Sequence, residues 1–255
     1  MKYRYEELAR MIDHALLHPT MTDAEVKEGC RLADRYGVAT VCVKPYHVPL
    51  ACQILQNSAV QVSCVIGFPA GNSATETKVA EARLACQQGV AEIDMVINIG
   101  KALSGDFDYV ENEIRAICDE AHSFGVKVKT IFETDYLSED AIKVRLCEIC
   151  GRTGTDWVKT STGFGFNKLA SGDYNYIGAT EHDLQLMRKH SPDHVQVKAS
   201  GGVRDLDGLI RVRDLGCTRL GTSATAAILD DYKRRENTES GTSSPSTASI
   251  GGGGY

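Results

Sequence analysis

The stretch DWVKTS, residues 156–161, alternates side chains of different character and carries a lysine near its centre. Because successive side chains of a β-strand point to opposite faces, Lys159 shares a face with Trp157 and Ser161, away from Val158. In a parallel sheet that closes into a barrel, one face meets the surrounding helices and the other meets the barrel axis. If Val158 faces the helices, this stretch is a barrel strand that directs Lys159 inward.

Seven further runs rich in Val and Ile alternate with amphipathic stretches of about 10 to 15 residues, as expected of βα units around a parallel sheet. With residues 156–161, the predicted strands are Met11–His14, Ala39–Lys44, Gln61–Gly67, Glu92–Asn98, Lys127–Glu133, His194–Ser200 and Thr218–Ser223. The predicted helices are Asp23–Tyr36, Thr75–Gln88, Asp108–Phe124, Ser138–Arg152, Gly178–His190, Asp205–Leu215 and Ala224–Arg235, with Thr22, Ser138 and Thr180 as N-terminal caps and Gly37, Gly89 and Gly125 as C-terminal caps. This α/β pattern predicts a single (β/α)8 TIM barrel, although an open doubly wound sheet also fits the count.

The two ends of the chain lie outside the alternating pattern. An extra N-terminal helix that begins near Tyr3 should precede the first strand and cover the bottom of the barrel. From Glu236 onward the sequence is poor in apolar residues and rich in Ser, Thr and Gly, which offers too little burial to offset the entropy of ordering. We therefore predict a barrel domain over residues 1–235 and a flexible tail over residues 236–255.

The composition narrows the class of protein. A formal net charge of −6 argues against a nucleic-acid partner or an anionic membrane surface. The N-terminus lacks the apolar run of a signal peptide and no stretch is long enough to span a bilayer, so a cytoplasmic location is expected. Nine cysteines fit reduced thiols, and the C-x-x-C of Cys147 and Cys150 lies in a helical pattern, which favours a structural role over a metal or redox site.

The same alternation, applied to the other strands, directs several charges toward the barrel axis. The inward set includes Asp94, Lys129, Glu133, Lys159 and Lys198. Removing a charge from water is costly unless the charge is paired, and barrel interiors normally hold branched apolar side chains. Because active sites lie at the C-terminal ends of barrel strands, a functional reason is favoured. A buried ion-pair network that only fixes the register of the strands is the alternative.

Clustered lysines favour one kind of chemistry. A lysine with its ordinary pKa near 10.4 is protonated at neutral pH, but a second ammonium group nearby lowers that pKa and frees the amine. The amine can condense with a carbonyl to give a Schiff base, whose protonated form withdraws electrons from the neighbouring carbon. The seven histidines form no metal-ligand pair on a predicted helix, so we expect no metal and an imine as the group that stabilises a carbanion.

Two glycine-containing turns predict an anion site. Residues 200–204 read SGGVR and follow the seventh predicted strand, and residues 221–223 end the eighth. In many (β/α)8 barrels these two loops bind phosphate through backbone amides and a helix N-terminus. A phosphorylated substrate is implied, with plain turns as the alternative.

Several separate motifs match one known family. The most specific are KTSTGF, residues 159–164, and VKASGGVR, residues 197–204. The others are Ile12–His14, Val41–Pro45, Gly67–Pro69, Thr77–Glu81, Glu92–Val96, and Lys129 with Glu133 and Thr134. From about residue 8 to residue 235 the chain resembles the deoxyribose-phosphate aldolases. The resemblance implies a class I aldolase, a lyase that reversibly cleaves 2-deoxy-D-ribose 5-phosphate to D-glyceraldehyde 3-phosphate and acetaldehyde.

The resemblance also implies roles for individual residues. Lys159 would form the Schiff base, Lys198 would lower the pKa of Lys159, and Asp94 would shuttle protons with Lys198 and a water. Tyr255 would assist protonation of the enamine, as a terminal tyrosine does in some members. A homodimer without a cofactor is expected. The residues that would surround the substrate are Asp13, Cys42, Lys129, Thr162, Gly163, Gly201, Gly202, Val203, Arg204, Gly221 and Ser223.

Some positions depart from the family pattern or stay open. Ala15 replaces a common Thr, Ser200 replaces an expected Ala, and Phe164 replaces a Lys of some members, so one contact to the substrate and one to the phosphate are expected to be missing. Cys42 is either a buried small side chain or a thiol that reacts with enals, and Tyr255 either assists catalysis or has no role. The alternative functions are a phosphosugar isomerase with a glutamate base, Glu133, and a non-catalytic phosphosugar-binding protein.

Overall fold

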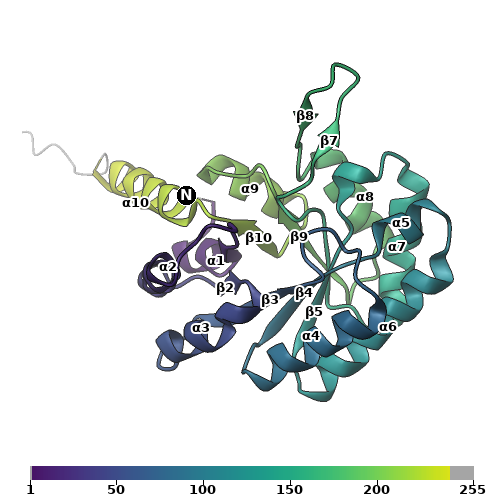
Figure 1. Ribbon diagram of the computed structural model, residues 1–255. Coiled ribbons are helices and arrows are strands. Elements are labelled where there is room, and N and C mark those ends of the chain that lie inside the picture. Colours follow the sequence, from purple (N-terminus) through teal and green to yellow (C-terminus); the bar gives the residue numbers. More distant parts are fainter. Residues whose placement is uncertain (1, 242–255) are drawn as a thin grey trace, which may run out of the picture.

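Eight parallel strands close into a barrel in the computed structural model, which describes residues 2–241 (Figure 1). Around the barrel their order is β1, β10, β9, β6, β5, β4, β3, β2. They are β1 (Ile12–Leu16), β2 (Thr40–Val43), β3 (Gln61–Ile66), β4 (Glu92–Val96), β5 (Lys127–Ile131), β6 (Trp157–Lys159), β9 (Gln196–Ser200) and β10 (Arg219–Thr222), and a separate antiparallel ribbon consists of β7 (Asn167–Lys168) and β8 (Tyr174–Asn175). Because β1 pairs with β10, the predicted closed barrel is confirmed and the open-sheet alternative is wrong.

Helices surround the barrel and connect its strands. They are α1 (Tyr5–Ala9), α2 (Asp23–Tyr36), η1 (Pro45–His47), α3 (Val48–Leu55), α4 (Thr75–Gln87), α5 (Ile99–Leu103), α6 (Phe107–Ser123), η2 (Thr134–Tyr136), α7 (Asp140–Thr153), α8 (Glu181–His190), α9 (Leu206–Asp214) and α10 (Thr225–Gly241). The sequence pattern does not predict α3 or α5. Both are short, eight and five residues, so neither is long enough for a helical period to repeat clearly in the sequence.

Residues at the helix ends account for several boundaries. As predicted, the side chains of Thr22 and Thr180 accept hydrogen bonds from backbone amides in the first turns of α2 and α8. Gly37 ends α2 with a φ of 65°, a conformation in which a Cβ atom would be strained. The predicted cap at Ser138 is wrong: α7 starts after Glu139, so Ser138 stands one residue too early to cap its first turn.

The N-terminal helix lies where the strands begin, as predicted. Arg10, which follows α1, donates hydrogen bonds to the carbonyls of Val38 and Ala59, just ahead of β2 and β3. The rings of Tyr5 and Tyr232 meet edge to face at 5.6 Å, which joins α1 to α10. The N-terminal helix α1 therefore lies at the bottom of the barrel and packs against α10, which lies beside α2 and α9 in the surrounding ring of helices (Figure 1).

The last described helix passes the predicted end of the barrel domain. We expect α10 to end at Arg235, and it continues to Gly241 because residues 236–240 hold no Pro or Gly to stop it. Arg235 pairs with Asp231 one turn earlier and with Asp207 on α9. Residues 242–255, with most of the predicted tail and Tyr255, lie outside the described residues, so the division into domain and tail stays a prediction.

The apolar core lies between the barrel and its helices. Ile93, Met95, Val158 and Val197, on three strands, are fully buried and belong to this core. Asp94, Lys159 and Lys198 alternate with them on the same strands, are also buried, and contact one another inside the barrel. Side-chain alternation therefore predicts the inward residues of β4, β6 and β9 correctly.

A ribbon rises from the C-terminal end of the barrel between β6 and α8 (Figure 1). The carboxylate of Asp135 anchors its returning strand by accepting hydrogen bonds from the backbone amides of Ile177 (2.8 Å) and Gly178 (3.0 Å). The Tyr136 hydroxyl accepts another from the amide of Phe166 (2.7 Å). The sequence pattern does not predict this ribbon, whose strands are only two residues long. Its anchors return the chain to the barrel mouth at a fixed position.

A buried ion pair fixes the end of β4, the strand that carries Asp94. Lys78 on α4 and Glu113 on α6 are fully buried, with 2.8 Å between nitrogen and oxygen. Lys78 also donates to the carbonyl of Val96 (2.8 Å), and Glu113 accepts from the amide of Asn98 (2.8 Å). The pair thereby links two helices to the backbone just beyond Asp94.

Breaking this pair should destabilise the fold. Glu113→Ala leaves Lys78 buried without its partner, so the free energy of unfolding in urea should fall by about 3–5 kcal/mol. The double variant Lys78→Met, Glu113→Leu should recover most of that loss, because it buries no lone charge. Glu120→Ala is the matched control: its pair with the exposed Arg83 joins the same two helices, and its loss should stay below about 1 kcal/mol. Equal losses for Glu113→Ala and Glu120→Ala would contradict this account.

Candidate active site

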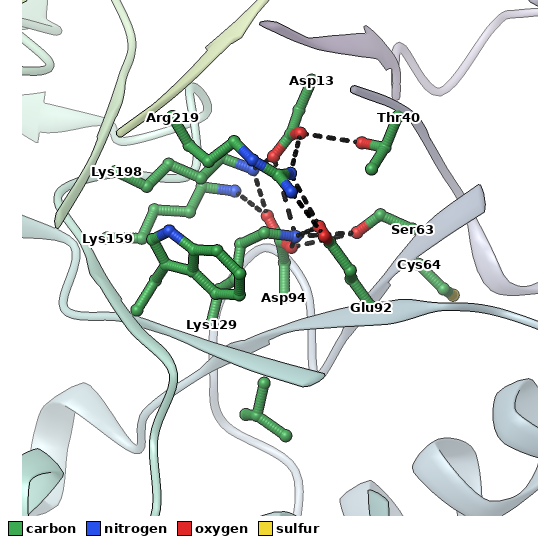
Figure 2. Close-up of polar contacts among 12 residues, drawn as sticks. Asp13, Thr40, Ser63, Cys64, Glu92, Asp94, Lys129, Lys159, Lys198 and Arg219 are labelled. Carbon is green, nitrogen blue, oxygen red and sulfur yellow. Dashed lines mark hydrogen bonds and ion pairs between the residues drawn. The ribbon is translucent and has the colours of Figure 1, made fainter. Parts of the chain in front are cut away.

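A network of charged side chains fills the barrel interior (Figure 2). Register brings Lys159 beside Lys198 and Asp94 beside Lys129 as partners on adjacent strands. The network connects six of the eight barrel strands through Asp13, Glu92, Asp94, Lys129, Lys159, Lys198 and Arg219. The interior thus holds pairs of opposite charge where a barrel ordinarily holds apolar layers.

Asp94 is the residue at which three lysines meet. Its Oδ2 accepts hydrogen bonds from the Nζ atoms of Lys159 and Lys198, at 2.7 Å each. Its Oδ1 accepts from Nζ of Lys129 at 2.7 Å and from the Ser63 hydroxyl at 3.1 Å. Burial alone would raise the pKa of this carboxyl, but the three ammonium groups hold it well below its usual range. Asp94 therefore remains ionised.

The same interior shifts the two lysines in opposite directions. Burial lowers the pKa of Lys159 below its ordinary value; the Asp94 carboxylate opposes that shift and the Lys198 ammonium adds to it. Burial also acts on Lys198, but the carboxylates of Asp13, 2.5 Å away, and Asp94 raise its pKa above the ordinary value. The sequence predicts that Lys198 lowers the pKa of Lys159, and the structure adds burial as the larger cause of this shift. Lys159 is thus suited to be an amine and Lys198 to stay an ammonium.

Glu92 and Arg219 complete the network, and sequence reasoning missed both. Arg219 bonds Asp13 and Glu92 at 2.6 Å each, and Glu92 also pairs with Lys129 at 2.5 Å. Alternation alone could have found Glu92, because it lies two residues before Asp94 on the same face of β4. Both residues begin their strands, however, whereas barrel active sites are sought at the strand ends. Their pairing balances the charges near the lysines.

A cavity of about 370 Å³ opens at the C-terminal ends of the strands. Lys159, Lys198 and the loops after β6, β9 and β10 line it. Its lining contains ten of the predicted substrate contacts: Asp13, Cys42, Thr162, Gly163, Gly201, Gly202, Val203, Arg204, Gly221 and Ser223. The eleventh, Lys129, does not line the cavity, because its ammonium is directed to Asp94 and Glu92. The sequence does not single out Tyr176, Leu17, His18, Met21 or Thr222, which also line it.

Glu133 does not contact the lysines, contrary to the prediction from alternation. The chain leaves β5 at Ile131, and Glu133 takes a left-handed backbone conformation with φ of 58°, so strand geometry no longer sets its direction. Its carboxylate accepts hydrogen bonds from the backbone amide and the hydroxyl of Thr162. Burial raises the pKa of Glu133 to about 7. A strained residue therefore clamps the loop that follows Lys159.

Two apolar contacts shape the mouth of the cavity. Phe164 meets Phe68 edge to face at 5.5 Å and packs near Leu17 and Cys42, so it covers the mouth with apolar surface where some relatives are expected to have a lysine. Cys42 is buried in the cavity wall, and burial raises the pKa of its thiol to about 11. A thiol with a raised pKa is a weak nucleophile, which favours the structural role for Cys42. Tyr255 lies outside the described residues.

Within residues 2–241, one group of carboxylates and histidine is close enough to surround a cation. It consists of Asp140, His182 and Asp183 on α7 and α8, away from the cavity lining. The ammonium of Lys143 already lies between its carboxylates, 2.9 Å from Asp140 and 2.5 Å from Asp183. This group is explained as a helix-to-helix ion pair.

Comparisons with known proteins agree with this geometry. A family model described as DeoC/LacD family aldolase matches residues 8–215. The chain therefore belongs to the DeoC/LacD family of aldolases. Its resemblance to deoxyribose-phosphate aldolases is also confirmed: the one from Rhodopirellula baltica is 47% identical over 91% of this chain and 92% of its own length, and the one from Caldanaerobacter subterraneus is 43% identical over 89% and 94%.

A solved structure supports the same family. The deoxyribose phosphate aldolase from Aeropyrum pernix superposes with a TM-score of 0.80 at 30% identity, covering 90% of this chain and 92% of that one. Among residues 2–241, no helix combines the length and the apolar character that crossing a bilayer requires.

The pH dependence of the lysine amine should reveal its neighbours. Because the pKa of Lys159 is lowered, its reaction with an aldehyde should increase as pH rises through a value below that of an ordinary lysine. Lys198→Leu removes a cation that lowers this pKa, so the midpoint should move up by about one pH unit. Reductive trapping by an aldehyde at a series of pH values measures the midpoint. Lys189→Leu, an exposed lysine on α8, is the control, and an unchanged midpoint in Lys198→Leu would refute the coupling.

Proposed function

We propose that this chain is a class I aldolase that reversibly cleaves 2-deoxy-D-ribose 5-phosphate to D-glyceraldehyde 3-phosphate and acetaldehyde. The observation that carries the proposal is a pair of buried lysines sharing one oxygen of Asp94, beside a cavity that two glycine-containing loops also line. A lysine of lowered pKa supplies the nucleophilic amine, and the loops supply donors for a phosphate. The names of the relatives support the same reaction.

In the cleavage direction, the amine of Lys159 attacks C1 of the open-chain sugar, and the carbinolamine loses water to give a protonated imine. The hydroxyl on C3 then gives up its proton, the bond between C2 and C3 breaks, and its electron pair passes through C2 to the imine nitrogen. D-glyceraldehyde 3-phosphate departs and leaves an enamine on Lys159. Protonation at C2 and addition of water release acetaldehyde and restore the amine.

The neighbours of Lys159 are proposed to move the protons. Lys198 keeps its proton at neutral pH and can donate it to the departing hydroxide of the carbinolamine. Asp94, held ionised, works with Lys198 and a water to take the proton of the C3 hydroxyl and return one to C2. Asp13 lines the cavity beside Lys198, and its proposed role is to contact substrate hydroxyls.

The phosphate is proposed to lie against the loops after β6, β9 and β10. Gly163, Gly201 and Gly202 have φ values of 88°, 89° and 84°, a left-handed conformation that lets consecutive amides point at one anion. Arg204 adds a positive charge and Ser223 a hydroxyl donor in the same lining. Val203 and Gly221 complete this wall and leave room for the ligand.

The alternative functions are less well supported. A phosphosugar isomerase would need Glu133 as a base, but its carboxylate accepts hydrogen bonds from Thr162 and the residue does not line the cavity. A non-catalytic binding protein would have no use for two adjacent lysines whose pKa values shift in opposite directions. The aldolase accounts for both observations.

We also propose a cytoplasmic homodimer that needs no cofactor. The family resemblance supports the dimer, and nine free cysteines, most of them buried, suit a reducing compartment. The Aeropyrum pernix relative is described as tetrameric. A solution mass other than that of two chains would refute the dimer.

Reductive trapping tests the nucleophile directly. Acetaldehyde with borohydride should attach an ethyl group to Lys159, because reduction fixes the imine as a secondary amine. Peptide mass spectrometry locates the modification. Lys159→Arg should show no such adduct at this site and should lose at least roughly 10³-fold in kcat. Full trapping on another lysine, with Lys159 unmodified, would contradict the mechanism.

Tyr255 is proposed to assist enamine protonation, on the strength of the family resemblance alone. Tyr255→Phe should therefore slow the exchange of the acetaldehyde methyl protons with deuterated solvent by roughly 10²-fold, since the phenol is the proton carrier. Proton magnetic resonance follows the exchange. If it proceeds at the wild-type rate, Tyr255 has no role in this step.

A further inference from the structure

Tyr176 places an unpartnered hydroxyl at the candidate phosphate site. It follows the β7–β8 ribbon and lines the same cavity as Lys159 and Lys198. Its oxygen is buried and has no hydrogen-bond partner among the described residues. A buried hydroxyl that is left without a partner is unfavourable, so a polar group that enters the cavity is expected to complete it.

The hydroxyl lies between two of the glycine loops. A Cβ atom on Gly201 would stand only 1.7 Å from the Tyr176 oxygen, and one on Gly163 would stand 3.7 Å from it. Gly201 follows β9 and Gly163 follows β6, so the oxygen reaches both loops that the phosphate would contact. Glycine at position 201 is what allows this close approach.

The surrounding backbone holds Tyr176 in this place. The next two amides, those of Ile177 and Gly178, donate to the carboxylate of Asp135. The amide of Ala179 then donates to the carbonyl of Gly201 at 3.2 Å, which joins the returning ribbon to the loop after β9. The position of the hydroxyl is therefore set before any ligand binds, which limits the entropy lost on binding.

The hydroxyl can serve only as a neutral donor or acceptor. Burial raises the pKa of Tyr176 above its ordinary value, and the carboxylates of Glu133 and Asp135 add to the shift, so the phenol keeps its proton at neutral pH. A phosphate oxygen accepts hydrogen bonds and donates none when fully ionised. Phe164, whose ring contacts Phe68 at the mouth, offers no hydrogen-bond donor, so the donors to a phosphate come from other residues of the cavity.

We propose that Tyr176 is a specificity-determining residue, whose hydroxyl donates a hydrogen bond to the phosphate of the substrate. The proposal rests on the proposed function for the identity of the substrate. It assigns to the β7–β8 ribbon a part in selecting a phosphorylated over an unphosphorylated sugar. Tyr176 does not touch the reacting carbons, so its contribution is to binding and orientation.

Two measurements on Tyr176→Phe test the proposal. The first is the Kd of inorganic phosphate by calorimetry, which should weaken roughly 10- to 100-fold, the usual effect of losing a hydrogen bond to a charged group. The second is the ratio of kcat/KM for 2-deoxy-D-ribose 5-phosphate to that for 2-deoxy-D-ribose, which should fall by a similar factor. The variant should fold normally, because the hydroxyl has no internal hydrogen bond to lose.

Tyr174→Phe is the matched control, since Tyr174 lies on the same ribbon with 55% of its surface exposed and does not line the cavity. It should keep both values of the wild type. An unchanged phosphate Kd and an unchanged ratio in Tyr176→Phe would overturn the proposal. If the wild type cleaves neither sugar, the proposed function fails, and the phosphate titration alone still decides for or against Tyr176.

Discussion

The carboxylate of Asp94 accepts hydrogen bonds from three lysine ammonium groups, and the charged interior of the barrel depends on it. Without this carboxylate, Lys129, Lys159 and Lys198 would face one another in a space from which water is largely removed. Buried like charges are costly, and a low-dielectric interior makes their repulsion stronger than it would be at the surface. Asp13 and Glu92 neutralise the remaining positive charge through ion pairs with Lys198, Lys129 and Arg219 (Figure 2).

Lys159 and Lys198 have different pKa values because they share these carboxylates unequally. Lys198 contacts both Asp13 and Asp94, whereas Lys159 contacts Asp94 alone. Burial lowers the pKa of both, yet two carboxylates outweigh it at Lys198 and one does not at Lys159. A single interior therefore shifts the pKa values of two adjacent lysines in opposite directions, which favours the amine form at Lys159 and the ammonium form at Lys198, as imine chemistry requires. The alternative of a network that only fixes register does not explain this difference.

Contacts outside the barrel hold the reacting groups at fixed distances. The Lys78–Glu113 pair fixes the end of β4, and the strained Glu133 clamps the loop after β6 through Thr162. The β7–β8 ribbon, anchored by Asp135, brings the Tyr176 hydroxyl between that loop and the loop after β9. Such supports reduce the freedom that a substrate would otherwise have to remove on binding.

The sequence by itself determined the eight barrel strands, seven of the helices that follow them, the inward direction of Asp94, Lys159 and Lys198, and the glycine loops, because period-2 alternation and glycine turns are local properties. The tertiary structure decided which inward residues meet. Strand register, which the side-chain pattern does not encode, paired Lys159 with Lys198 and brought Arg219 to Glu92. The tertiary structure also decided where side-chain alternation stops, because Glu133 lies beyond the end of β5. Tyr176 reaches the cavity only because the β7–β8 ribbon folds back onto the barrel, and a contact between segments that do not follow the strand alternation cannot be read from local sequence.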